Sequence, residues 1–354
     1  MMAADTPIWV DAAQGLEIYL RHEPTPEVTS LLERTVWGSR NLRYRIREVA
    51  GKLARLNDPY VFTMEKCGKL AAVCILNRKS VQLLGAPYDT IHFVMIATEE
   101  ACKGQNLAGL LSVQIRCYLE QYLNAPAVAY AYIESTTDYS LRISDRVGHT
   151  FEAFMPLTVF SRLWPKDDDR VEAMADGEVE DVAARLYKLY DGHGFVDFET
   201  SLNSEEYFVL RRQGRIVAGA QAEVLHWSVV DMPGWIGGSL VKLLPYLPVL
   251  RHMLPVQDFR FLRFGNLLVE PCHEAQLMQL LEALLARHGV RVGLIMMDQR
   301  SPVLRRIRAF GRLGPLRWAV KGATKVVADF KGVSEEDIVR IAAQPMMVSP
   351  RDVF

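Results

Sequence analysis

The sequence is poor in cysteine and carries almost no net charge. Its 354 residues include five cysteines, and none of them forms a Cys-x-x-Cys pair or a metal-ligand spacing. An odd and scattered set of this kind predicts reduced thiols in a cytoplasmic protein without a metal site. The net charge of −1 at pH 7 excludes a strongly basic surface, so we expect no nucleic-acid partner. A Gly-x-Ser-x-Gly elbow is also absent, which argues against serine hydrolysis.

The chain lacks an uninterrupted apolar run that could cross a membrane. Its most apolar stretch, 235–256, contains Lys242, Arg251, His252 and three prolines, which would break a spanning helix. We expect 231–257 to be a helical insertion that covers a pocket or an interface, including the interface of a homodimer. An interfacial membrane helix and ordinary core packing are the alternatives. The first thirty residues hold five acidic side chains and no long apolar run, so we expect no signal peptide.

The order of predicted elements repeats along the chain. Apolar periodicity predicts a helix, three strands, a helix, a strand, a helix and a strand, twice over. A chain of this length suits two domains, and the aspartate run within 166–177 is typical of an exposed linker. We therefore expect one domain at 1–165, a second at 178–330, and a C-terminal helix and tail at 331–354.

The individual elements follow from apolar spacing, caps and turn residues. Before the linker we predict strands at 17–21, 60–66, 70–78, 90–97, 127–133 and 151–160, with helices at 28–36 (capped by Thr25 or Thr29), 42–56, 106–122 and 139–146. After it we predict a helix around 182–190, strands at 207–211, 216–225, 261–269, 291–297 and 318–330, and helices at 274–286 and 301–310.

The most informative stretch is 91–111, where an apolar strand runs through a polar turn directly into a helix. The free N–H groups at a helix start form an anion site, and small residues let a phosphate approach the backbone. We interpret this turn as a cradle for a pyrophosphate such as that of coenzyme A. Its residues are Lys103, Gly104, Gln105, Asn106, Leu107, Ala108 and Gly109.

This cradle resembles the acyl-CoA-binding motif of the GNAT N-acetyltransferases, Arg/Gln-x-x-Gly-x-Gly/Ala. Lys103 takes the Arg/Gln place, Asn106 the first glycine place and Ala108 the Gly/Ala place, and only the last is a standard match. Lysine can still bind a phosphate as a point charge, and asparagine tolerates left-handed backbone angles. An ordinary strand-to-helix turn is the alternative interpretation.

The resemblance implies an α/β (α+β) fold with two GNAT-like domains, each a mixed, mostly antiparallel sheet flanked by helices. In that family the sheet splits between the strands that correspond to 90–97 and 127–133, and pantetheine lies in the split. Backbone groups of Met95, Ile96 and Ala97 would then bind the cofactor amides. Acetyl-CoA, or another acyl-CoA, becomes the expected cofactor.

A second family element covers the helix at 139–146. By the family's spacing, Ser144 stands where many members have a tyrosine that protonates the departing thiolate, and serine is a much weaker acid. Tyr139 and Tyr132 are nearby phenols that could replace it. His92 and Glu134 are the titratable groups best placed to take a proton from the acceptor amine. A core histidine and a solvated strand end are the respective alternatives.

The second half has no comparable cradle, because Glu270-Pro271-Cys272-His273-Glu274 contains no glycine and Pro271 lacks an amide donor. We expect this half to keep the fold without binding coenzyme A. Its C-terminal strand could complete or border the acceptor pocket of the first half. The tandem arrangement with an apolar, basic, proline-bearing insertion is similar to the plant Hookless-type N-acetyltransferases.

The resemblance predicts an acyl-CoA-dependent N-acyltransferase, in which an unidentified small-molecule or peptide amine attacks the thioester directly. A non-catalytic binding or regulatory protein on the same fold is one alternative. Transfer of a long acyl chain, with 235–256 lining the chain site, is the other.

Overall fold

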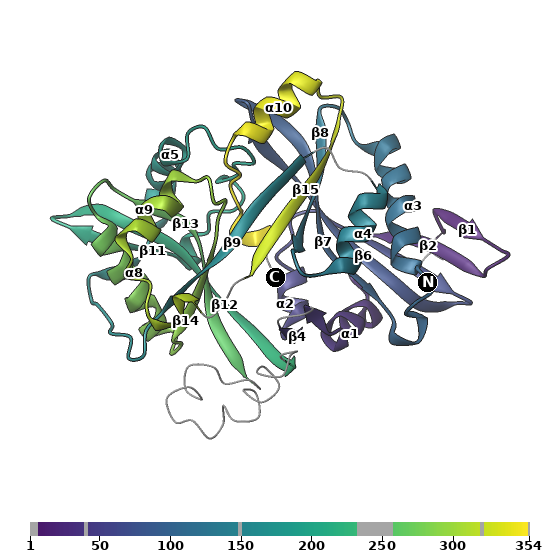
Figure 1. Cartoon of the computed structure of the whole chain (residues 1–354), viewed down its shortest axis with the longest axis horizontal. Helices are drawn as coiled ribbons and strands as arrows, with labels where there is room; N and C mark the ends of the chain where they lie inside the picture. The colour runs from purple at the N-terminus through teal and green to yellow at the C-terminus, as the bar shows by residue number, and fades with distance from the viewer. Residues whose placement is uncertain (1–5, 39–41, 148–150, 232–257, 319–321, 353–354) are drawn as a thin grey trace.

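A computed structural model describes residues 6–38, 42–147, 151–231, 258–318 and 322–352 (Figure 1). The predicted insertion at 231–257, and with it the predicted dimer surface, lies outside the described residues except for Asp231. In the part of the chain that is described, no helix is long and apolar enough to cross a membrane.

The fold is a mixed α/β architecture with a mostly antiparallel sheet flanked by helices, as the sequence predicted, but one large sheet runs through both halves where a sheet in each half was expected. The strands follow the order β1-β2-β5-β6-β7-β8-β15-β9-β14-β13-β12-β11-β10, and β3 and β4 lie off this path. Among the described strands, β7 with β8 and β13 with β14 are the parallel pairs.

The first half of the chain, residues 6–161, contains most of the elements that surround the cavity described below. Its strands are β1 (Trp9–Asp11), β2 (Leu16–Arg21), β3 (Trp37–Gly38), β4 (Arg43–Ile46), β5 (Pro59–Lys66), β6 (Lys69–Leu83), β7 (Ala86–Thr98), β8 (Ala127–Glu134) and β9 (Phe151–Ser161). Its helices are α1 (Pro26–Arg34), α2 (Val49–Leu53), α3 (Leu107–Tyr122) and α4 (Asp138–Val147).

The second half, residues 171–352, repeats a similar order. Its strands are β10 (Val171–Ala173), β11 (Tyr207–Arg212), β12 (Arg215–Asp231), β13 (Phe259–Val269), β14 (Val292–Met296) and β15 (Ala323–Lys331). Its helices are α5 (Val179–Leu189), α8 (Glu274–Arg287), α9 (Pro302–Phe310) and α10 (Glu335–Ala343), and a short 3-10 turn, Pro350–Asp352, lies near the end of the chain.

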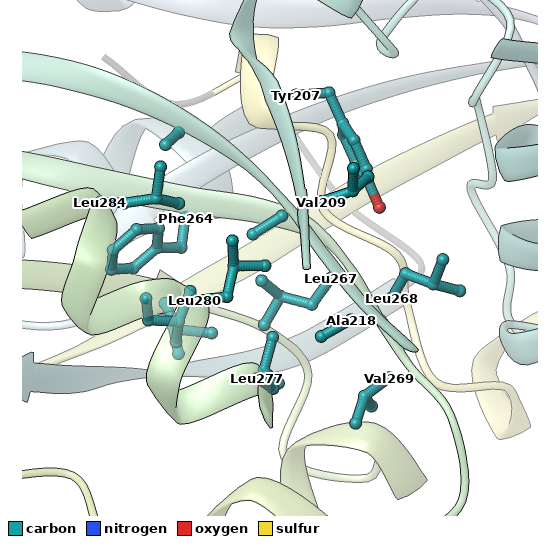
Figure 2. Close-up of a cluster of buried hydrophobic side chains, with 14 of the residues drawn as sticks. Tyr207, Val209, Ala218, Phe264, Leu267, Leu268, Val269, Leu277, Leu280 and Leu284 are labelled. Carbon is teal, nitrogen blue, oxygen red and sulfur yellow. The ribbon is translucent and has the colours of Figure 1, made fainter. Parts of the chain in front are cut away.

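Helix α8 covers the core of the second half. Figure 2 shows Leu277, Leu280 and Leu284, one apolar face of this helix, meeting Phe264 and Leu267 of β13. These five side chains are buried. Their spacing of three and four residues along α8 is that of an amphipathic helix against a sheet, which is why the sequence alone locates this element closely.

The last strand of the chain joins the two halves. Strand β15 pairs antiparallel with β8 from Lys331↔Ala127 to Thr324↔Glu134, and its other edge pairs with β9 (Figure 1). Strand β9 in turn pairs with β14 of the second half. The sequence predicted both strands, but it placed β9 as the closing strand of the first unit and β15 as the last of the second. Each strand instead bridges the halves.

One predicted helix is wrong over its first part. The segment predicted as helix 42–56 contains strand β4, and only Val49–Leu53 is helical. Strand β4 pairs with β3 and with the far end of β12, and the Tyr44 ring stacks on Trp227 at 3.9 Å between centroids. Tertiary pairing with a strand about 180 residues away decides this local structure, so propensity could not reveal it.

Candidate active site

Strands β7 and β8 separate in the middle of the sheet. Their parallel pairing runs from Asp89↔Ala127 to Phe93↔Ala131 and then stops, although both strands continue. On its other edge β7 has a bulge, because Phe93 pairs with Leu76 and Met95 pairs with Ile75, which leaves Val94 as an extra residue. Beyond Phe93, β7 therefore has one edge whose backbone groups have no partner on β8.

A cavity of about 660 Å³ opens at this separation, a size that suits a small-molecule ligand. Its walls come from β7, β8, α3 and α4, from the β3–β4 hairpin, and from β15 and β14 of the second half. The prediction that the C-terminal strand borders this pocket is confirmed, since Thr324, Val327 and Phe330 of β15 line it.

The predicted cradle has the backbone geometry that the sequence indicated. Asn106 is the N-cap of α3 with φ of 58°, and Gly104 has φ of 82°, so both adopt left-handed angles. A Cβ atom on Gly109 would lie 2.6 Å from Asn106 Oδ1, so a residue with a side chain would not fit there without a shift. The turn thus keeps the compact form that exposes helix N-terminal amides.

Two lysines lie at this turn. The Lys103 side chain is 55% exposed and pairs with Glu100 at 2.5 Å, so its ammonium is within reach of a ligand at the helix start. Lys66, at the end of β5, donates to Gln105 Oε1 at 2.6 Å. Lys66 was not predicted, because it is 39 residues from Gln105 in sequence and reaches the turn only in the folded chain.

The predicted cofactor residues fall into two groups. Met95 and Ile96 line the cavity, whereas Ala97 and the turn residues Lys103–Gly109 do not. Helix α3 links the turn to the cavity, because its later residues Ser112, Arg116 and Leu119 are part of the wall.

A buried polar cluster forms part of the cavity wall, and sequence reasoning missed its key member. Asp352, two residues from the end of the chain, accepts hydrogen bonds from Lys79 Nζ at 2.8 and 2.9 Å and from the Tyr130 hydroxyl at 2.9 Å. The Tyr132 hydroxyl is 3.5 Å away. Since 222 residues separate Asp352 from Tyr130, no local pattern could have joined them.

His92 completes this cluster from β7. Its Nδ1 is buried, lies 3.7 Å from Asp352 Oδ1, and has no hydrogen-bond partner among the described residues. Its ring stacks on Tyr130 at 4.9 Å and meets Tyr132 edge-on at 5.1 Å. The cluster is thus a carboxylate and an imidazole side by side, held between two phenols and one ammonium.

The electrostatics of the cluster fix its charges at neutral pH. Burial lowers the pKa of His92 from 6.5 to about 4, so the imidazole is neutral. Burial is the largest single influence and opposes ionisation of Asp352, but the Lys79 ammonium, His92 and the hydrogen bonds from Lys79 and Tyr130 together hold the pKa of this carboxyl below its usual value. Burial also raises the pKa of Tyr130 and Tyr132 well above 10, so both phenols stay protonated.

The remaining predicted catalytic residues have different positions. Glu134 and Ser144 line the cavity, whereas Tyr139 does not and is 45% exposed. Glu134 accepts hydrogen bonds from the hydroxyls of Thr136 at 3.0 Å and Thr137 at 3.5 Å. Burial raises its pKa above 4.5 despite these hydrogen bonds.

Buried tyrosines bond the β13 backbone where its pairing with β14 ends. Strands β13 and β14 pair only from Leu262 to Phe264. Beyond this point the carbonyls of Asn266 and Leu267 accept hydrogen bonds from the Tyr207 hydroxyl at 3.1 Å and the Tyr190 hydroxyl at 3.0 Å. These two carbonyls of β13 therefore have partners within the chain.

The C-terminal tail also packs on β13. A Cβ atom on Gly265 would lie 2.2 Å from Pro350 Cγ, so the tail packs directly on the β13 backbone. The tail therefore contacts the second half and delivers Asp352 to the separation in the first.

No protein-family model and no curated protein sequence matches this chain. Among solved structures, it is similar to Saccharomyces cerevisiae N-myristoyltransferase with bound myristoyl-CoA, at a TM-score of 0.61 and 9% identity over 99% of this chain and 90% of that one. A second structure of the yeast enzyme, with bound myristoyl-CoA and inhibitors, gives 0.63 and 10% over 99% and 88%. A GCN5-related N-acetyltransferase from Sphaerobacter thermophilus gives 0.44 and 12% over 77% and 82%. At these identities the likeness is one of fold: over almost its whole length, the chain shares the fold of the N-myristoyltransferase structures.

Proposed function

We propose that this protein is an acyl-CoA-dependent N-acyltransferase, in which a neutral amine attacks the thioester carbonyl directly. The observation that carries the proposal is the cavity at the β7–β8 separation, with the buried Asp352–His92 pair in its wall. The turn at Lys103–Gly109 supports coenzyme A as the carrier, since it offers helix N-terminal amides and a nearby lysine. The yeast structures of the same fold hold myristoyl-CoA.

The cluster suits removal of a proton from the acceptor. An alkylammonium must lose a proton before its nitrogen can attack, and Asp352 is ionised while His92 is neutral, so both can accept one. Tyr130 and Tyr132 hold the carboxylate by their hydroxyls and have pKa values too high for efficient proton donation.

The departing group needs little help. As the new C–N bond forms, the C–S bond breaks and its electron pair leaves with sulfur as a thiolate. A thiol has a pKa of about 8.5, so the thiolate is a competent leaving group without a strong acid beside it. Because the thiolate leaves without a strong acid, the reaction does not require a tyrosine at the position of Ser144. Backbone amides of β7 beyond Phe93 are the groups placed to polarise the carbonyl.

The first candidate for the transferred group is acetyl, because acetyl-CoA is the simplest ligand to test. A long acyl chain is the second candidate. Leu119, Leu123, Ala127 and Ala129 form an apolar part of the cavity wall between α3 and β8. An acetyl group is too small to cover this apolar surface, whereas a long alkyl chain would bury it and be buried by it.

Calorimetry with acetyl-CoA and myristoyl-CoA tests both statements. We expect binding to the intact chain, weakened by Lys103→Glu and unchanged by Lys188→Glu, a charge reversal in the last turn of α5. Tighter binding of myristoyl-CoA would support the long-chain candidate, and equal affinities would count against it. Failure of the folded protein to bind either ligand at millimolar concentration would refute the proposed function.

A further inference from the structure

Glu134 differs from the other carboxylates that line the cavity. Its hydrogen-bond donors are two threonine hydroxyls, and within the described part of the chain no cationic side chain lies within ion-pair distance of it. The other three are paired with cations: Glu120 and Asp329 with Arg116 at 3.0 and 3.2 Å, and Asp352 with Lys79 at 2.8 Å.

The environment of Glu134 is unfavourable for a lone charge. The side chain is partly buried, and burial raises its pKa. A carboxylate withdrawn from water is costly unless a counter-charge accompanies it. Thr136 and Thr137 orient the carboxylate, one on each oxygen, but they do not neutralise it. A cation from outside the chain would supply the missing partner.

Aromatic rings accompany this carboxylate. Tyr44 and Trp37 of the β3–β4 hairpin line the same cavity, and one face of the Tyr44 ring is stacked on Trp227 at an angle of 13°. Burial and, secondarily, Glu134 raise the pKa of Tyr44. An aromatic ring face attracts an ammonium within about 6 Å. Together, these rings and the Glu134 carboxylate favour binding of a cationic group.

The position of Glu134 along β8 indicates how far its carboxylate lies from the Asp352–His92 pair. Tyr132 and Glu134 are two residues apart on one extended strand, so they share a face and their Cα atoms are about 7 Å apart. Tyr130 and Tyr132 both reach Asp352 by their hydroxyls, and His92 is in register with Tyr130. Glu134 therefore lies two to four residues farther along the strand than the proton-accepting pair, which is about 7–13 Å.

We propose that Glu134 and Tyr44 form a subsite for a second positive charge on the acceptor. The acceptor is then an aliphatic amine with an ammonium about 7 Å or more from its reacting nitrogen, the separation in a diamine with at least four or five methylene groups. This inference rests on the proposed function and deepens it, since it names the substrate class for the same cavity.

The test compares diamines with monoamines of equal chain length in an assay of thiol release from the acyl-CoA that binds. The probes are 1,4-diaminobutane and 1,5-diaminopentane against 1-aminobutane and 1-aminopentane. A charge-assisted contact predicts a KM for the diamines lower by about tenfold to a hundredfold. Glu134→Gln should raise the KM of the diamines and so abolish this preference. Glu134→Asp should restore part of it, and Glu152→Gln, at an exposed carboxylate on β9, should have no effect.

Equal KM values for diamines and monoamines in the unmodified protein would overturn the inference. Glu134→Gln slowing both classes equally would also overturn it, because Glu134 would then act on the reacting nitrogen. If the protein binds acyl-CoA but turns over none of these amines, calorimetry of 1,5-diaminopentane against the CoA complex decides, and absence of binding refutes the subsite. Failure of acyl-CoA to bind refutes the proposed function itself, a result visible without any amine.

Discussion

Replacement of Asp352 by asparagine removes the carboxylate of the buried Asp352–Lys79 ion pair. The side chains of Asp352 and Lys79 are 3% and 4% exposed, and the pair is joined by two hydrogen bonds. Asparagine keeps the shape of the side chain but removes its charge. The Lys79 ammonium then keeps Asp197 as a carboxylate neighbour, 3.8 Å away.

The expected cost can be worked out from this geometry. Removal of one member of a buried ion pair destabilises a protein by about 3–5 kcal/mol, and the remaining Asp197 carboxylate should offset part of this. We expect Asp352→Asn to lower the free energy of unfolding by about 3 kcal/mol. If Asp352 also accepts the acceptor proton, kcat should fall about a hundredfold or more.

A second substitution separates the two effects. Addition of Lys79→Met to Asp352→Asn removes the ammonium that has lost one of its two carboxylate neighbours, so the double variant should lose less stability than the sum of the single variants. Its kcat should stay low, because no carboxylate has returned to the cavity. Urea unfolding gives the stability, and thiol release with an amine gives the rate.

Two results would refute the roles assigned to Asp352, one for the ion pair and one for proton transfer. A change in unfolding free energy below about 1 kcal/mol for Asp352→Asn would mean that the buried pair is not formed. Recovery of kcat together with stability in the double variant would mean that Asp352 supports the fold and takes no part in proton transfer.

Three further predictions follow from the same region. The pKa of His92 is about 4 in the folded protein against 6.5 for a free histidine, so the unfolded chain binds a proton more readily. The free energy of unfolding should therefore decline as pH falls from about 6.5 towards 4, by up to about 1.4 kcal/mol per pH unit. His92→Phe should flatten this slope, measured by urea unfolding at several pH values. Gly265→Ala places a Cβ 2.2 Å from Pro350, so it should displace the tail and lower both Tm and activity, whereas Gly51→Ala in α2, which meets nothing within 4 Å, should not. Calorimetry should find one acyl-CoA per chain, because the turn after β13 contains no glycine and Pro271 lacks an amide donor; a stoichiometry of two would contradict this.

The sequence predicted the local features of the fold well. Thr25 caps α1 and accepts a hydrogen bond from the Val28 amide at 3.4 Å, and Asn106 begins α3 with a left-handed angle. Both depend on residues a few positions apart, where side-chain chemistry acts directly on the backbone. The separation of β7 from β8, expected from the family resemblance, is confirmed by the register that ends at Phe93↔Ala131.

The sequence predicted the cavity wall only where motifs of the resembled family covered it. His92, Glu134 and Ser144 were named in advance and line the cavity, while Asp352, which also lines it, and its buried partner Lys79 were not named. A tail residue without a motif has no signature in a single sequence. Strand β4 was missed for a related reason, since its main partner is β12 in the other half.

Sequence alone thus determined the elements, the α3 turn and the residues of β7 and β8 that face the separation, because periodicity, caps and turns are local. Only the tertiary structure decided where β15 is inserted and what the C-terminal tail does. Insertion of β15 beside β8 and packing of Pro350 on Gly265 together carry Asp352 to Lys79 and His92. Burial then sets the charges of that cluster, and burial is a property of the assembled fold rather than of any segment.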